Sequence, residues 1–205
     1  MAGKLITLEG GEGAGKTTQQ TAIQAYLQAK GIAVVLTREP GGTHLGEAIR
    51  GLVLGSEFVG MATDAELLLM FAARAEHLAK VIRPALAQGQ WVVCDRFIDA
   101  TYAYQGGGRG VAVERIALLE QWSLQGLVPD LTLWLDLAPE MGLARANKRG
   151  ALDRFETEQQ SFFQRVRAQY QQRAQQVPHR IQPIDAAQPI ESVTRQIQAA
   201  LDRLF

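Results

Sequence analysis

The segment GGEGAGKT at residues 10–17 constrains the fold of this chain more than any other feature of the sequence. It satisfies the pattern GxxxxGK(S/T), directly after an apolar run at residues 4–9 and directly before a stretch of helical periodicity at residues 16–30. A glycine-rich turn in this position can point several backbone amides at one phosphate group, and the helix N-terminus adds partial positive charge. The sequence therefore predicts a phosphate-binding loop within a βα unit.

Two side chains of this loop have defined roles towards a bound nucleoside triphosphate. Lys16 is expected to reach the β- and γ-phosphates, and the Thr17 hydroxyl is expected to coordinate Mg²⁺. A glycine-rich turn with an accidental lysine is the alternative, and the strand and helix on either side argue against it. The residues predicted to hold the nucleotide are Gly10, Gly11, Glu12, Gly13, Ala14, Gly15, Lys16, Thr17 and Thr18.

Strand-like and helix-like segments alternate along the rest of the chain. The predicted strands are residues 4–9, 32–37, 90–95, 131–136 and 180–185. The predicted helices are residues 16–30, 63–88, 113–125, 139–149, 155–176 and 190–204. Several strands are almost wholly apolar, which suits a parallel sheet covered on both faces, and each crossover can reach a parallel neighbour. We therefore expect one α/β domain over residues 1–205, with a three-layer, doubly wound fold around a five-stranded parallel sheet.

The composition argues against several classes of protein. The 21 basic and 21 acidic side chains cancel, so no net charge attracts nucleic acid or an anionic membrane. The single cysteine, Cys94, leaves no internal disulfide, and the three histidines are too scattered for a metal cluster. No segment approaches the roughly 18 apolar residues of a membrane span. We expect a cytoplasmic protein without nucleic-acid or membrane partners.

An acid and a guanidinium follow the third predicted strand. Ligands of open parallel sheets bind beyond the carboxyl ends of the strands, which is where Asp95 and Arg96 fall. The Asp95 carboxylate can hold Mg²⁺ through water, and the Arg96 guanidinium can bridge the phosphates of a donor and an acceptor. A surface ion pair is the alternative, but the position at the strand tip favours a functional role.

A phosphate-binding loop alone does not distinguish a kinase from a switch or a motor. The only stretch similar to the guanine-specifying NKxD signature is NKRG at residues 147–150, which has glycine in place of the aspartate. A GTPase is therefore disfavoured, and the neutral charge balance disfavours a motor on nucleic acid. The sequence indicates a small phosphotransferase, with a nucleotide-dependent binding or switch protein as the alternative.

Further motifs indicate which phosphotransferase family the chain resembles. They are the phosphate loop, TREPGG at 37–42, DR at 95–96, AYQGG at 103–107, PDL at 129–131 and LDRFE at 152–156. In this order the chain closely resembles the bacterial thymidylate kinases over nearly its whole length. The resemblance implies the nucleoside-monophosphate-kinase fold, transfer of the γ-phosphate of ATP to dTMP to give dTDP, Mg²⁺ as the metal, and a homodimer. A kinase for another pyrimidine or deoxynucleoside monophosphate is the nearest alternative.

The resemblance also implies which residues contact the sugar and phosphate of dTMP. Glu12 matches an acidic residue near the sugar 3′-hydroxyl and the acceptor phosphate. Because a carboxylate in a loop built for phosphates is electrostatically awkward, we expect Glu12 to have a hydroxyl or Mg²⁺ as partner. Arg38 and Arg50 resemble arginines that contact the acceptor phosphate, with Arg96 between the two substrates, and Pro40 resembles part of the wall of the base pocket.

The positions expected to meet the thymine base come from two segments. Arg74 resembles the arginine that reads a carbonyl edge of the base, and Thr101 and Gln105 match polar positions on the pyrimidine. Tyr104 matches a tyrosine that crowds the 2′-carbon of the sugar and so disfavours ribose.

The family stacks an aromatic ring on the base from the helical turn before Arg74. Both Met70 and Phe71 share roughly one helix face with Arg74, so the position is open between them. Phe71 is the preferred candidate because a flat ring stacks on a base better than a thioether does, and a core role is the alternative for either.

Residues 145–156 resemble the lid of the family. Some relatives carry an arginine in the phosphate loop where this chain has Gly13, so we expect the lid to supply the missing charge through Arg149 or Arg154, ahead of Arg145. A lid arginine closing over ATP also excludes water. A solvated basic loop is the alternative. The residues expected to act in catalysis are Lys16, Arg96, Asp95, Glu12, Arg149 and Arg154.

Overall fold

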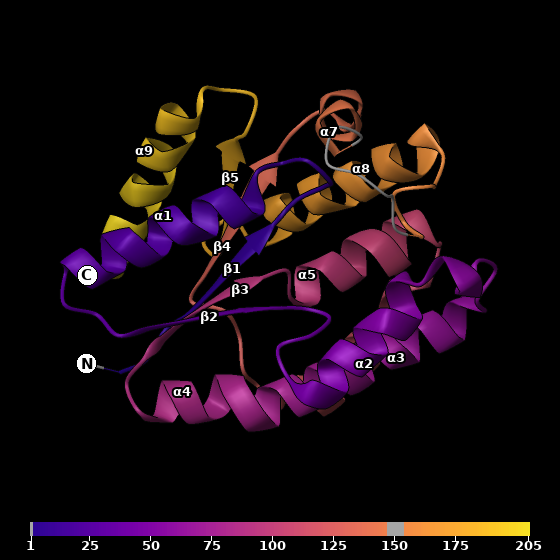
Figure 1. Cartoon of the computed structure of the whole chain (residues 1–205), viewed down its shortest axis with the longest axis horizontal. Coiled ribbons are helices and arrows are strands. Elements are labelled where there is room, and N and C mark those ends of the chain that lie inside the picture. The colour runs from indigo at the N-terminus through magenta and orange to yellow at the C-terminus, as the bar shows by residue number, and fades with distance from the viewer. Residues whose placement is uncertain (1, 147–153) are drawn as a thin grey trace.

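The computed structural model describes residues 2–146 and 154–205, and its centre is a five-stranded sheet. The strands are β1 (Leu5–Glu9), β2 (Val34–Arg38), β3 (Trp91–Asp95), β4 (Leu131–Asp136) and β5 (Ile181–Asp185). Their order is β2-β3-β1-β4-β5, and each neighbouring pair is parallel. Helices cover both faces of the sheet (Figure 1). The predicted three-layer α/β fold with a five-stranded parallel sheet is confirmed.

The helices fill the two outer layers. Their bounds are α1 Lys16–Ala29, α2 His44–Leu54, α3 Thr63–His77, α4 Arg83–Ala87, α5 Ile98–Thr101, α6 Val113–Leu124, α7 Pro139–Ala146, α8 Gln160–Gln176 and α9 Ile190–Leu201. Two π-helical segments lie at Leu78–Ile82 and Tyr102–Gly108, and two 3₁₀ turns lie at Ser56–Phe58 and Asp202–Leu204. None of these helices is long and apolar enough to cross a membrane, for the residues described.

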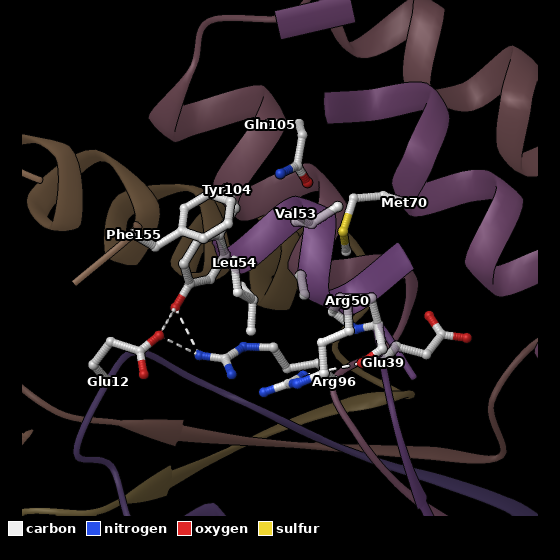
Figure 2. A pocket seen from close by; sticks show the side chains of 12 residues that line it. Glu12, Glu39, Arg50, Val53, Leu54, Met70, Arg96, Tyr104, Gln105 and Phe155 are labelled. Carbon is white, nitrogen blue, oxygen red and sulfur yellow. Dashed lines mark hydrogen bonds and ion pairs between the residues drawn. The ribbon is translucent and has the colours of Figure 1, made fainter. Parts of the chain in front are cut away.

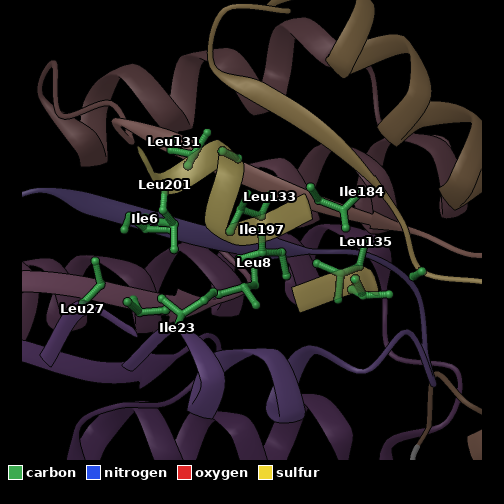
Figure 3. Close-up of a cluster of buried hydrophobic side chains, with 14 of the residues drawn as sticks. Ile6, Leu8, Ile23, Leu27, Leu131, Leu133, Leu135, Ile184, Ile197 and Leu201 are labelled. Carbon is green, nitrogen blue, oxygen red and sulfur yellow. The ribbon is translucent and has the colours of Figure 1, made fainter. Parts of the chain in front are cut away.

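The core divides between the two faces of the sheet, because successive side chains of a strand point to opposite faces. Ile6 and Leu8 of β1 pack with Ile23 of α1 and Ile197 of α9 on one face (Figure 3). Leu5 packs on the other face, in a cluster supplied by α3, α4 and α6. Since both faces are covered, the three central strands, β3, β1 and β4, are mostly apolar rather than alternating.

The helices differ from the sequence expectation in several places. The predicted helix at residues 63–88 is divided into α3, a π-helical segment and α4, which has Pro84 at its start. The helix predicted to begin at residue 155 begins at Gln160. The helix α2 was not predicted, although Thr43 caps it by accepting a hydrogen bond from the Gly46 amide over 2.9 Å.

The segment from α5 to the end of the π-helical turn at Gly108 was also not predicted as helical. Its glycines suggest a loop, but they allow close packing against α8. A Cβ atom on Gly107 would lie 2.8 Å from the Arg165 carbonyl oxygen, and one on Gly108 would lie 2.5 Å from the Phe162 ring. Tertiary contact with α8 therefore explains both the glycines and the helical conformation.

Candidate active site

The phosphate loop wraps in front of α1 with its lysine turned inward. Gly13 and Gly15 have φ angles of 66° and 91°, and a Cβ atom on Gly13 would lie 2.2 Å from the Gly142 carbonyl oxygen. The Lys16 ammonium donates to the carbonyl oxygens of Gly10 and Gly11 over 3.2 and 3.0 Å. Burial lowers the pKa of Lys16, and the charge of Arg96 lowers it further. An anion in the loop would supply the compensating negative charge.

The tip of β3 carries the second cation. Leu8 of β1 lies beside Asp95 in the sheet register, and the Arg96 amide donates to the Leu8 carbonyl over 2.8 Å. Arg96 adopts a left-handed backbone conformation with φ of 66°, which is uncommon outside glycine and typical of functional sites. The strand pairing thus brings Arg96 to the phosphate loop, as expected from its place at a strand end.

Arg96, Glu12 and Tyr104 form a hydrogen-bonded cluster at this point (Figure 2). The Arg96 guanidinium donates to Glu12 Oε1 over 2.6 Å and to the Tyr104 hydroxyl over 2.9 Å. The Tyr104 hydroxyl donates to the same Glu12 oxygen over 3.0 Å. The carboxylate in the phosphate loop therefore has both a hydroxyl and a guanidinium as partners, which offsets its unfavourable position among phosphate-binding groups.

A first cavity extends from this cluster away from the phosphate loop (Figure 2). Its polar end carries Glu12, Arg50 and Arg96. Its other walls are supplied by Glu39, Pro40, Val53, Leu54, Met70, Ala100, Tyr104, Gln105 and Phe155. A cavity with cations at one end and apolar side chains at the other suits a molecule that joins an anionic group to a flat apolar ring.

The inner end of this cavity has unsatisfied hydrogen-bonding atoms next to it. Gln105 donates to Glu66 over 2.8 Å, while its carbonyl oxygen is buried without a partner. Arg74 is fully buried and donates to Glu39, to the Phe97 carbonyl and to the Thr101 hydroxyl, and its Nη1 atom is buried without a partner. Leaving such atoms unpaired is costly, so they indicate a ligand with its own donors and acceptors.

A second cavity, of about 270 Å³, lies over the phosphate loop. It is lined by residues 13–18 of the loop and by Asp95, and it shares Glu12, Arg50 and Arg96 with the first cavity. Asp95 Oδ1 is buried and has no hydrogen-bond partner. A carboxylate oxygen and the Thr17 hydroxyl are oxygen ligands of the kind that Mg²⁺ takes beside phosphates, so the residues present fit this ion.

A third cavity, of about 570 Å³, continues from the other side of the loop. It is lined by loop residues, by Arg145 and by the connection between β5 and α9 at residues 186–190. The sequence analysis assigned no role to this connection, because its residues are small or uncharged and carry no motif. Only its place beside the phosphate loop in the folded chain identifies this connection as a candidate part of the site.

The comparisons with known proteins agree with this arrangement. The family model for thymidylate kinase matches residues 8–197. The chain belongs to the thymidylate kinase family. A thymidylate kinase of Pseudomonas putida strain GB-1 is 62% identical over 201 residues, which cover 98% of this chain and 96% of the relative. One from Alkalilimnicola ehrlichii is 59% identical over 97% of this chain and 92% of the relative.

The crystal structure of thymidylate kinase from Ehrlichia chaffeensis has a similar fold. It superposes with a TM-score of 0.80 at 35% identity, covering 98% of this chain and 99% of that one. The chain is therefore a kinase that binds nucleotides, with ATP as co-substrate and Mg²⁺ as the metal of the family. Among the described residues no group of three or more His, Cys, Asp or Glu side chains could hold a metal ion.

Most of the side chains expected from the thymidylate kinase resemblance to contact dTMP line the cavities, but four do not, namely Arg38, Phe71, Arg74 and Thr101. Arg74 and Thr101 are fully buried and hydrogen-bonded to each other. Phe71 packs in the core with 3% of its surface exposed, 5.0 Å from the Arg74 guanidinium, whereas Met70 lines the first cavity. Arg38 is exposed and donates to Glu47 over 2.9 Å, away from both cavities. One residue of difference along α3 turns a side chain about 100° around the axis, which decides between core and cavity.

The structure describes only some of the arginines that the thymidylate kinase resemblance places in a lid. Arg149 lies outside the described residues. Arg154 is buried, with Nη2 donating to Glu66 over 2.7 Å and Nε donating to the Val53 carbonyl over 2.8 Å. Arg154 therefore anchors the chain at this point to α2 and α3, and it does not line the second cavity.

One buried carboxylate behind the phosphate loop had no predicted role. Glu9, the last residue of β1, accepts from the Phe97 amide over 2.9 Å and from the Tyr170 hydroxyl over 2.8 Å. Burial raises the pKa of Glu9 to about 8, and the charge of Asp99 adds to the rise. Its position directly before the loop is a signal in the sequence, but its partners come from distant segments.

Proposed function

We propose that this kinase transfers the γ-phosphate of ATP to dTMP, giving dTDP and ADP. The observation that carries the proposal is that the two cavities meet at Glu12, Arg50 and Arg96. A donor phosphate in the loop and an acceptor phosphate at the polar end of the first cavity would then lie next to each other. Proximity and alignment of two polyanions are the main requirements of phosphoryl transfer.

The acceptor phosphate of dTMP is already an anion, so the reaction needs no general base. Lys16 and Arg96 offset the charge that builds up on the transferred group. Mg²⁺, when bound, neutralises the β- and γ-phosphates, and the Thr17 hydroxyl and the Asp95 carboxylate would hold it. We propose that the loop residues 10–18 bind the phosphates of ATP and that the third cavity takes its nucleoside.

We propose that the base of dTMP lies among the apolar side chains of the first cavity, with Met70 against its face. Arg74, Thr101 and Gln105 would supply the hydrogen bonds to its edges, Arg50 would contact its phosphate, and Pro40 would form part of the wall. The unpaired atoms of Arg74 and Gln105 support this assignment. The role of Arg38 on the phosphate and that of Phe71 in stacking are not part of this proposal, since Arg38 is paired with Glu47 and Phe71 packs in the core.

Tyr104 is proposed to disfavour ribose. Its ring packs edge-on against Phe155 and Phe162, with centroids 5.7 and 6.2 Å away, and its hydroxyl is held by Arg96 and Glu12. Burial raises the pKa of Tyr104, which keeps the phenol protonated and able to donate. A ring held on several sides cannot move to admit an additional hydroxyl group.

We propose that residues 1–205 form one kinase domain and that residues 145–156 form its lid. Arg149 is then the lid cation that meets the transferred phosphate, since Arg154 would have to leave Glu66 to do so. We also propose a cytoplasmic location, where ATP is supplied and the single thiol, Cys94, stays reduced.

A homodimer is proposed through α3 and α6. Leu68, Leu118 and Trp122 expose 57%, 68% and 71% of their surfaces. Asp64 lies one turn from Leu68 and pairs with Arg115, which shares a face of α6 with Leu118 and Trp122. These side chains therefore form one apolar surface across two helices, of the kind that a second copy of the chain would cover.

The proposal is tested by following ADP release with and without dTMP. We expect dTMP to accelerate ADP release strongly, and dUMP, UMP, CMP and AMP to do so less. Lys16→Met provides the control, because it keeps an unbranched, flexible side chain but removes the charge that binds phosphate. Slow hydrolysis that dTMP does not accelerate would indicate a nucleotide-dependent binding or switch protein instead.

A further inference from the structure

A chain of buried polar side chains leads from β2, through His77 at the end of α3, to Glu39 at the first cavity, which we call the acceptor cavity because it is proposed to take dTMP. Thr37, His77, Glu39 and Arg74 each expose no more than 9% of their surfaces. The His77 ring lies 2.6 Å from the Thr37 hydroxyl and 3.0 Å from Glu39 Oε1. Glu39 Oε2 in turn accepts from Arg74 Nε over 2.7 Å. Nothing in the function described above uses His77.

Both ring nitrogens of His77 have hydrogen-bond partners. The Glu39 carboxylate accepts from Arg74 and has no proton to give, so Nδ1 donates to it, and Nε2 shares a hydrogen bond with the Thr37 hydroxyl. The ring is also enclosed, because a Cβ atom on Gly42 would lie 2.7 Å from Nε2. The imidazole therefore has one orientation, fixed by a hydroxyl on one side and backbone on another.

This fixed ring gives each oxygen of Glu39 its own donor. His77 holds Oε1 and Arg74 holds Oε2, so the carboxylate cannot turn to meet the guanidinium with both oxygens. The Arg74 guanidinium is left to bind the Phe97 carbonyl and the Thr101 hydroxyl through Nη2, with Nη1 unpaired. Glu39 itself lines the acceptor cavity.

We propose that His77 is a positioning residue for the acceptor site: through Glu39 it holds Arg74 in the orientation that meets the base of the nucleoside monophosphate. This inference rests on the proposed function, in which Arg74 reads the base. It assigns a specific task to a histidine that would otherwise be a buried polar residue satisfied by its neighbours.

The test compares steady-state constants of His77→Phe and the wild type. Phenylalanine keeps the shape of the ring but removes the donor to Glu39. We expect the KM for dTMP to rise about tenfold, as is typical for loss of a hydrogen bond to a charged group, with the KM for ATP unchanged. A purely structural role would lower the active fraction, and hence apparent kcat, without changing the KM for dTMP.

Rescue and control variants sharpen the comparison. His77→Gln can donate its amide to Glu39 and accept from Thr37, so we expect it to recover much of the affinity for dTMP. His179→Gln removes an exposed histidine remote from both cavities and should match the wild type. If His77→Phe does not fold, His77→Asn replaces it, because its shorter side chain cannot reach both partners and should raise the KM for dTMP similarly.

A wild-type KM for dTMP in the folded variant, or an equal rise in the KM for ATP, overturns the role of His77. Failure of the wild-type enzyme to phosphorylate dTMP would instead overturn the proposed function, so the two outcomes are distinguishable.

Discussion

The Arg96 guanidinium donates to the Glu12 carboxylate over 2.6 Å, at the point where the cavity of the phosphate loop meets the acceptor cavity. A cation from the tip of β3 and an anion from the loop after β1 therefore hold each other where the two substrates are proposed to meet. The pairing keeps Arg96 in place before the phosphates arrive, which reduces the reorganisation needed during the reaction.

Arg96→Ala is expected to lower kcat by about 10²- to 10³-fold, the usual effect of removing a group that stabilises transition-state charge. The affinity for ATP should change much less, because Lys16 and the loop amides remain. Steady-state kinetics together with direct measurement of ATP binding check both parts. Arg96→Lys keeps the charge but loses the planar guanidinium, so its kcat should lie between those of the wild type and the alanine variant. Unchanged turnover in the purified alanine variant would contradict the assignment.

Gly13→Ala is expected to weaken ATP binding and to destabilise the fold by about 1–3 kcal/mol, because the loop must distort. The added Cβ would lie 2.2 Å from the Gly142 carbonyl oxygen, at a φ angle of 66° that favours glycine. Chemical denaturation and ATP titration measure the two effects. The matched control is Gly51→Ala in α2, where nothing lies within 4 Å of the added atom and stability should rise by about 0.5–1 kcal/mol. Equal stability of the two variants would show that the close approach carries no cost.

Glu9 should make stability depend on pH. Its pKa is raised from the usual 4.5 to about 8 in the folded chain, so between these values the folded state holds a proton that the unfolded state has lost. Stability therefore falls as pH rises through this window. Relative to Glu9→Gln, the wild type should lose roughly 2–3 kcal/mol between pH 6 and pH 8. Urea unfolding of both proteins at the two pH values measures the difference, and parallel behaviour would exclude a raised pKa.

Alanine substitutions at Met70 and at Phe71 should affect different properties, dTMP binding in the first case and stability in the second. Met70→Ala opens the wall of the acceptor cavity, so we expect a higher KM for dTMP with an unchanged KM for ATP. Phe71→Ala leaves a hole in the core under β3, which should cost about 3–5 kcal/mol of stability while the KM of the folded enzyme stays near that of the wild type. The opposite result would place the stacking side chain at Phe71.

Trp122→Glu should convert the proposed dimer into a monomer, because it places a charge in the middle of the apolar surface on α3 and α6. Light scattering over a range of concentrations measures the mass. Ala199→Glu adds the same charge to an exposed position of α9, on the opposite face of the sheet, and should leave the mass unchanged. A wild-type chain that is monomeric at all concentrations would rule out this interface.

Several parts of this protein follow from short, continuous stretches of sequence. The phosphate loop at residues 10–17 is a local structure. Its glycines, lysine and threonine lie next to each other in the sequence, so this short stretch is enough to predict it. The strands were predictable because burial on both faces requires apolar runs of a definite length. Asp95 and Arg96 could be placed at the site because their strand ends at the same edge of the sheet as β1.

The acceptor cavity depends instead on tertiary structure. Its walls come from the phosphate loop, the segments directly after β2 and β3, α2, α3, α5, the π-helical segment at Tyr102–Gly108 and the turn at Phe155. Glycines at residues 106–108 suggest a loop until α8 packs against them, and Met70 rather than Phe71 meets the cavity because of the rotation of α3. The chain from Thr37 through His77 and Glu39 to Arg74 joins residues up to 40 positions apart. Local periodicity fixes which segments are helices and strands, but the orientation of each helix about its axis is set by packing against distant segments, and that orientation decides which side chains reach the ligands.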